Sequence, residues 1–231
     1  MKTRINKYMS EIGFCSRREA DKLIEASRLS VNDQVPEIGQ KVDESDVIKV
    51  DGKVISHQND KVYLLYNKPY GITSTTDDKD PTNIVKAINY PKRLFHVGRL
   101  DKDSEGLIIM TNDGDIVNEI LREENNNEKE YIVKVDKKIT PSLMRGMESH
   151  VPILDTVTKK ARVKQVSPFE FHLIITEGMN RQIRRMCAYF DYKVVKLKRI
   201  RIMHLTLDMP KGKYRHMTKE ERETLFKAIK K

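Results

Sequence analysis

Residues 98–107 read Gly-Arg-Leu-Asp-Lys-Asp-Ser-Glu-Gly-Leu, the densest polar cluster in the chain, and the fold assignment rests on them. The cluster leads directly into an apolar run at residues 107–110 that is typical of a buried strand. Its acidic spacing fits the first half of a calcium-binding loop, but Asn112 stands where that loop needs a bidentate glutamate. Two interpretations remain: an acidic turn between strands, or a functional site that uses the carboxylate of Asp101.

The segments around this cluster alternate irregularly between strand and helix patterns. An apolar run at residues 62–66 predicts a buried strand that ends in the polar segment 67–71, and alternating apolar residues predict strands at 131–135 and 169–175. Helices are predicted at residues 83–88, 116–121 and 181–190, and Thr218 begins a final helix. Because no regular βαβ unit or repeat emerges, the predicted class is α+β.

Three further segments favour a functional site. Residues 129–131, Lys-Glu-Tyr, open a strand after a polar loop, and residues 179–186 run from a loop into a cationic helix. A basic strand follows at 197–202. Residues 179–215 hold 11 basic and two acidic residues, which accounts for nearly all of the net charge of +10. Basic residues that alternate with Val, Leu and Ile indicate a folded surface suited to phosphate.

The first 56 residues form a separate pattern of two short helices followed by β signals. Ile5, Tyr8, Met9 and Ile12 share one helical face, and Gly13 ends that helix. Ser16 with a glutamate three residues later is a capping-box signature, and arginines 17 and 18 then open the second helix, where a helix N-terminus favours phosphate. A hairpin turn is predicted at residues 51–52. The polar residues 57–61 are the predicted linker.

Composition and the absence of certain motifs limit the classes of function that the chain can have. The chain has 231 residues, two widely separated cysteines and no apolar stretch long enough to span a membrane. Its first residues lack the apolar core of a signal peptide, so a cytoplasmic location is predicted. It has no dinucleotide-binding fingerprint, no P-loop and no cluster of metal ligands, so no cofactor and no metal are expected.

In this order and spacing, these motifs resemble the pseudouridine synthase family that modifies ribosomal RNA, in particular the subgroup with an N-terminal RNA-binding module. The resemblance covers nearly the whole chain. It implies an RNA-binding module at 1–56, a linker at 57–61 and, at 62–231, a catalytic domain built on a mixed, mainly antiparallel sheet. Residues 32 and 33, Asn-Asp, depart from the usual Asn-Gly of the module, although aspartate tolerates the left-handed turn conformation.

The resemblance also implies roles for individual residues. Asp101 would be the catalytic carboxylate, either as a nucleophile at C1′ or as a base at C2′; Arg184 would be its ionic partner; and Tyr131 would stack on the uracil. The reaction needs no redox step, and one carboxylate can suffice because the uracil is retained. The residues predicted to contact RNA are Arg4, Lys7, Arg17, Arg18, Arg99, Arg181, Arg185, Lys198, Arg199 and Arg201.

The predicted activity is isomerisation of a uridine in ribosomal RNA, with the base flipped out of its stack. Large-subunit RNA is favoured, while small-subunit RNA and a tRNA stem-loop remain open as substrates. The main alternative is a non-catalytic ribosome-assembly factor that binds RNA. A metal-dependent nuclease using Asp101, Asp103 and Asp113 is a further alternative, which EDTA sensitivity would identify. The two-domain pattern gives no reason to require association of several chains, so a monomer is expected.

Overall fold

The structure is a computed structural model that describes residues 2–43, 45–55 and 61–229. Its contacts divide the chain into two compact units. One comprises Met1–Val62 with the short segments Tyr90–Leu94 and Asn112–Gly114, and the other comprises the remaining residues. Most of the predicted linker, residues 57–60, lies outside the described residues. No helix in the described ranges is long and apolar enough to cross a membrane.

The N-terminal unit packs two helices against short strands. Its elements are β1 (Thr3–Arg4), α1 (Ile5–Glu11), α2 (Arg17–Glu25), β2 (Leu29–Val31), β3 (Lys41–Val42), β4 (Ile48–Val50) and β5 (Lys53–Val54). Strands β2, β4 and β5 form one antiparallel sheet, and β1 pairs with β3. The helical pattern of the sequence is confirmed, because Ile5 and Met9 are completely buried in the core of this unit.

Local signals in this unit behave as the sequence predicts. The Ser16 hydroxyl accepts a hydrogen bond from the backbone of Glu19, whose carboxylate accepts one from the Ser16 backbone, so the capping box is formed. Asp33 has φ of 67°, the left-handed conformation expected where related modules use glycine. The two residues of the turn between β4 and β5 are likewise left-handed, as a tight hairpin requires.

The second unit is built on a mixed sheet of nine strands, and its main path has the order β12-β13-β9-β14-β8-β6-β16. Only β14 and β8 pair in parallel among these strands. The strands are β6 (Tyr63–Lys68), β7 (Phe95–Val97), β8 (Glu105–Thr111), β9 (Lys129–Val135), β12 (Arg162–Ser167), β13 (Glu170–Ile175), β14 (Val194–Ile202), β15 (Leu205–Thr206) and β16 (Tyr214–His216). The α+β class is thereby confirmed.

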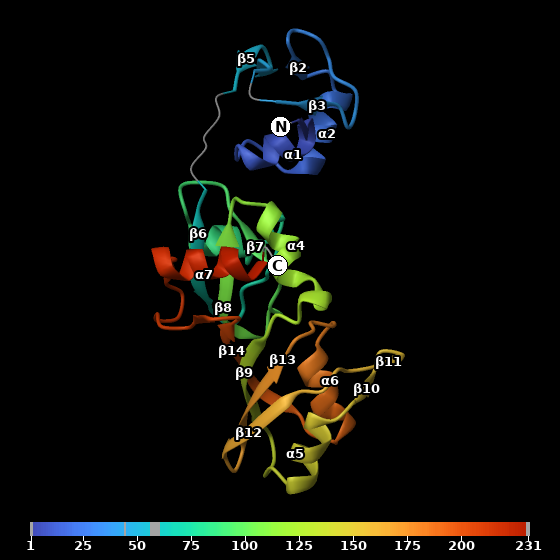
Figure 1. Cartoon of the computed structure of the whole chain (residues 1–231), viewed down its shortest axis with the longest axis vertical. Helices are drawn as coiled ribbons and strands as arrows, with labels where there is room; N and C mark the ends of the chain where they lie inside the picture. Colours follow the sequence, from blue (N-terminus) through green and yellow to red (C-terminus); the bar gives the residue numbers. More distant parts are fainter. Residues whose placement is uncertain (1, 44, 56–60, 230–231) are drawn as a thin grey trace. The chain divides into compact units, whose positions relative to one another are not determined.

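Helices cover this sheet at two places (Figure 1). At one end, α5 (Pro141–Glu148) and α6 (Gln182–Tyr189) pack on β9 and β13 through an apolar cluster that includes Met147, Phe171 and Met186. At the other, α4 (Asp115–Leu121) and α7 (Lys219–Ile229) pack on β6 and β8. The smaller elements are α3 (Ile84–Ile88), η1 (Glu123–Asn125), β10 (Pro152–Ile153) and β11 (Thr156–Val157). The sheet therefore has two separate apolar cores.

Three sequence expectations need correction at element boundaries. Strand β6 does not end before Lys68, because this lysine is the last residue of the strand and is completely buried. Phe169 precedes β13 and is 44% exposed, so it belongs to the turn. Arg181 is not helical: it has φ of 51° and lies immediately before α6. At the other end of α6, Asp191 adopts the left-handed conformation that is common just after a helix.

Candidate active site

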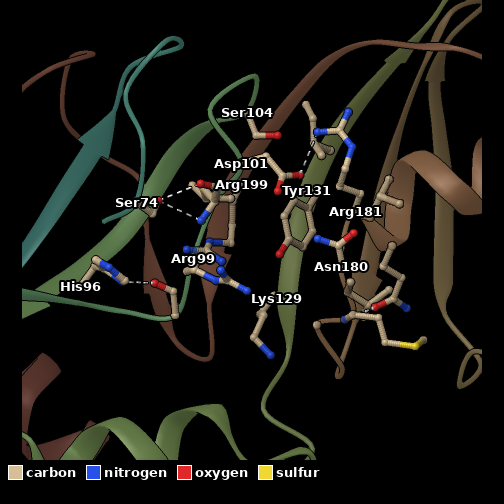
Figure 2. A pocket seen from close by; sticks show the side chains of 18 of the residues that line it. Ser74, His96, Arg99, Asp101, Ser104, Lys129, Tyr131, Asn180, Arg181 and Arg199 are labelled. Carbon is tan, nitrogen blue, oxygen red and sulfur yellow. Dashed lines mark hydrogen bonds and ion pairs between the residues drawn. The ribbon is translucent and has the colours of Figure 1, made fainter. Parts of the chain in front are cut away.

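A pocket of about 650 Å³ lies in the second unit, beside the loop at residues 98–104 (Figure 2). The loop supplies one wall and the start of β9 another, while the segment before α6 and the middle of β14 complete the lining. These segments are far apart in the sequence. The sheet brings them together because β14 pairs with both β8 and β9.

The backbone of the loop is held by polar contacts from the segment that follows β6. The buried hydroxyl of Ser74 donates to the Leu100 carbonyl over 2.8 Å and accepts from the Leu100 backbone N–H over 3.1 Å. The Gly71 N–H donates to the carbonyl of Lys102, also over 2.8 Å. These contacts on either side of Asp101 fix the position from which its side chain reaches the pocket.

The carboxylate of Asp101 is partly exposed, with 34% of its side chain accessible. Nη1 of Arg181 lies 3.7 Å from its Oδ2 (Figure 2). Nη2 of the same arginine lies 2.9 Å from Oδ2 of Asp103. Asp103 has a pKa below its ordinary value: partial burial would raise it, but the hydrogen bond from Arg181 and the charge of Arg184 outweigh burial. Arg181 therefore joins two negative carboxylates.

The predicted ion pair between Arg184 and Asp101 is not formed. Arg184 instead donates from Nη2 to the backbone carbonyl of Asp103 over 2.7 Å and from Nη1 to the carbonyl of Val194 over 3.1 Å. Its side chain is only 14% exposed. Arg181, which is left-handed immediately before α6, reaches both carboxylates, whereas Arg184 lies within α6 and bonds the backbone of the loop. Arg184 thus links the backbone of the loop to the backbone of β14.

Tyr131 lines the same pocket, as the sequence predicts, and only 7% of it is exposed. It lies on β9 opposite Leu173 of β13 and Arg199 of β14. Since alternate residues of a strand share a face, its ring lies on the same side of the sheet as Val133. Asp101 and Tyr131 therefore face one pocket, although 30 positions separate them in the sequence.

Two ionisable groups near the pocket are affected by burial. The completely buried Lys68 donates from Nζ to the carbonyls of Pro69 and Ile72, and burial lowers its pKa to about 8 although Asp101 opposes this effect. His96 donates from Nδ1 to the Gly98 carbonyl over 2.7 Å, and burial lowers its pKa as well. A neutral imidazole is therefore expected at neutral pH.

The predicted RNA-binding residues fall into three groups. Arg4, Arg17 and Arg18 are exposed on the N-terminal unit, and Lys7 pairs there with Glu11 over 3.3 Å. Arg99 and Arg181 line the pocket, while Arg185 is exposed beside it and donates to Asn180. Lys198 is half-buried on β14.

Two members of the predicted set need correction. Arg199 is 3% exposed, lines the wall of the catalytic pocket and donates from Nε to the Leu107 carbonyl, so it ties β14 to β8 and is not an exposed contact for an RNA backbone. Arg201 donates to Glu130 and Glu128 over 2.8 and 3.1 Å, and its remaining nitrogen bonds a backbone carbonyl. Both side chains make hydrogen bonds within the sheet because β14 is a central strand, and Nη2 of Arg199 is buried without a hydrogen-bond partner in the described part of the chain.

Three residues of the site are absent from the predicted set. Lys129, which is 7% exposed, and Asn180 both line the pocket, and they lie in the segments 129–131 and 179–186 that the sequence singles out. Ser74, which anchors the loop, lies in an ordinary polar segment, so only its tertiary neighbours reveal its place. Across the described ranges, no group of three or more His, Cys, Asp and Glu side chains could hold a metal ion. The metal-dependent nuclease would need such a group of ligands, and the described residues do not provide one.

Comparison with known proteins shows the family of the chain. The family model described as RNA pseudouridylate synthase matches residues 62–189, and the S4 domain model matches residues 3–48. The chain belongs to the RNA pseudouridine synthase family. The dual-specificity RNA pseudouridine synthase RluF of Salmonella typhi is 53% identical over 230 residues, which cover 98% of this chain and 80% of that protein.

Two other members of the pseudouridine synthase family extend the comparison. The ribosomal large subunit pseudouridine synthase B of Bacillus subtilis is 35% identical, with 94% of this chain and 93% of that protein covered. A crystal structure of a pseudouridylate synthase superposes with a TM-score of 0.71 at 28% identity, covering 96% of this chain and 99% of that one. Residues 129–131, 151–154 and 180–186 indicate a likeness to RluF within the family, and the identity confirms it. This chain is a pseudouridine synthase with an N-terminal S4 domain.

Proposed function

We propose that this pseudouridine synthase isomerises a uridine of large-subunit ribosomal RNA and that Asp101 is its catalytic carboxylate. The observation that carries the proposal is the meeting of Asp101, Tyr131 and Arg181 at one pocket. A duplex uridine cannot reach a carboxylate in such a pocket while stacked, so the target base flips out first.

In the proposed mechanism, the N1–C1′ bond of the uridine breaks and a C5–C1′ bond forms after the uracil turns. Asp101 acts as an ionised group, either as the nucleophile at C1′ or as the base at C2′. Arg181, rather than Arg184, lies within ion-pair distance of this carboxylate and orients it. Tyr131 stacks on the uracil, and it takes the C5 proton only if its own hydroxyl has first lost a proton.

The choice of RNA rests on relatives and on charge. One relative is named for the large ribosomal subunit and another for dual specificity, so a second RNA, a tRNA stem-loop, belongs to the proposal. The S4 domain, at residues 1–56 in our assignment, would bind RNA beyond the target base, and residues 62–231 would hold the catalytic machinery. We further propose that the enzyme works as a monomer in the cytoplasm.

The test is tritium release from RNA labelled at uridine C5, with EDTA present. Large-subunit RNA, small-subunit RNA and tRNA would each be incubated with the wild type and with an Asp101→Asn variant. Release by the wild type alone, followed by mapping of the modified base, would support both the substrate and the carboxylate. Tight binding of all three RNAs without release would favour the non-catalytic assembly factor, and equal release by both proteins would remove Asp101 from its role.

A further inference from the structure

A second and smaller cavity, of about 370 Å³, lies next to Arg181. Arg181 lines both cavities. The wall of the second one is formed by the outer side of α6, the first residues of β14 and Tyr70, which follows β6. The proposed mechanism gives this cavity no role.

Positive charge dominates the lining of the second cavity. Three cations, Arg181, Arg184 and Lys193, face a single carboxylate, that of Asp103. Both arginines already neutralise this carboxylate, at 2.9 and 3.4 Å. Lys193 is exposed, and its ammonium has no ion-pair partner among the residues that the structure describes. Nε of Arg184 is buried and likewise lacks a hydrogen-bond partner there. The cavity therefore suits an anion.

The same cavity also offers an exposed aromatic ring. Tyr70 is 67% exposed, and Val195 on the opposite strand is 59% exposed. The backbone around Tyr70 is held in place, because Pro69 precedes it and the N–H of Gly71 bonds the catalytic loop. An exposed aromatic ring beside cations is the combination that proteins use to bind single-stranded nucleic acid, with the base stacked and the phosphate neutralised.

We propose that this cavity binds the nucleotide next to the flipped uridine. Its phosphate would lie between Arg181 and Lys193, and its base would stack on Tyr70. Since Arg181 lines both cavities, a strand whose uracil occupies the catalytic pocket brings its neighbouring nucleotide close to the second one. The inference rests on the proposed function, since the uridine in the catalytic pocket defines which nucleotide is its neighbour.

The first experiment measures stacking without catalysis. The probe is an RNA hairpin with an all-uridine loop that contains one 2-aminopurine, whose fluorescence falls when it stacks. The wild type should quench the probe, and Tyr70→Ala should abolish the quenching and weaken binding by about 5- to 150-fold, the range for losing one stacked base. Tyr70→Phe should restore both. The matched control is Tyr189→Ala, which removes an exposed tyrosine of α6 that lies outside the cavity.

A second pair of variants tests the phosphate. Lys193→Ala should reduce the salt dependence of binding by about 0.7 in the log–log slope, the value for one phosphate contact to a single strand. Lys164→Ala, an exposed lysine of the edge strand β12, should leave the slope unchanged. If Tyr70→Ala and Lys193→Ala behave like their controls, RNA does not occupy the cavity and the inference is overturned.

The final experiment connects the cavity to turnover. Single-turnover tritium release would be measured with RNA that lacks the base on the 5′ or the 3′ side of the target uridine. Loss of the correct neighbouring base should slow the wild type but not Tyr70→Ala, so the two changes should be non-additive. Additive effects at both positions would overturn the inference. Quenching that depends on Tyr70 without any tritium release would overturn the proposed function alone.

Discussion

Arg181 stands between Asp101 and Asp103, and this position leads to the first prediction. Arg181→Ala should lower the single-turnover rate at saturating RNA on the order of 10²-fold, because a misplaced catalytic group costs about that much. Arg181→Lys, which keeps the charge 3.7 Å from Asp101 but loses the planar fork, should recover part of the rate. The measurement is tritium release under saturating RNA. A wild-type rate for Arg181→Ala would contradict its role beside Asp101.

Arg184 should affect stability more than the chemistry of the site. Arg184→Ala removes the donors for two backbone carbonyls, those of Asp103 and Val194, and should lower the free energy of unfolding by about 2 kcal/mol or more. Urea unfolding measures this change. The control is Arg185→Ala, an exposed neighbour, which should stay within about 0.5 kcal/mol of the wild type. Equal destabilisation of the two variants would contradict the role of Arg184 as a link between the loop and β14.

Lys68 should make stability depend on pH in the alkaline range. Burial lowers its pKa from the ordinary value of 10.5 to about 8, so between these values the unfolded chain binds a proton that the folded chain has released. The free energy of unfolding of the wild type, measured relative to Lys68→Met, should therefore rise with pH across this window, by at most about 3 kcal/mol. Urea unfolding of both proteins at several pH values tests this, and a constant difference would contradict it.

At the scale of elements, the parallel pairing of β8 with β14 depends on Gly106. This glycine has φ of 111°, and a Cβ there would lie 2.7 Å from the backbone nitrogen of Arg199 and closer still to its carbonyl oxygen. Gly106→Ala should therefore lower the free energy of unfolding by about 2–5 kcal/mol, from backbone strain and overpacking together.

The control for Gly106 is Gly178→Ala. A Cβ at Gly178 meets nothing within 4 Å, and its φ is not in the left-handed region. This variant should unfold within about 0.5 kcal/mol of the wild type. Urea or thermal unfolding measures both variants. If Gly106→Ala proves as stable as Gly178→Ala, the close approach of the two strands does not limit the sheet.

At the scale of the whole molecule, the net charge of +10 predicts that RNA affinity falls steeply with salt, because each neutralised phosphate releases counterions. Replacing both Arg17 and Arg18 with alanine should reduce the log–log slope by about 0.7–0.9 for each phosphate that the variant no longer neutralises. Arg201→Gln should leave the slope unchanged, since this guanidinium is engaged by Glu128 and Glu130. Filter binding or anisotropy between low and high salt measures the slopes, and a salt-independent affinity would contradict the phosphate contacts.

The amino-acid sequence by itself determined the features that depend on near neighbours. The capping box at Ser16, the inward face of α6 and the buried strand after Asp101 all follow from spacings within a few residues. The loop carrying Asp101 and the family were identified in the same way, because backbone geometry confines these motifs to short stretches.

Only the tertiary structure decided which side chains meet. Pairing of β14 with β8 joins Arg199 to the Leu107 carbonyl across 92 positions and places a predicted RNA contact in the buried wall of the catalytic pocket. Lys68 resembles a loop lysine until the sheet buries it. Arg181, and not the predicted Arg184, lies beside Asp101. Arg181 is the left-handed residue immediately before α6. Such outcomes depend on strand order and register, which bring distant segments together and which no local spacing specifies.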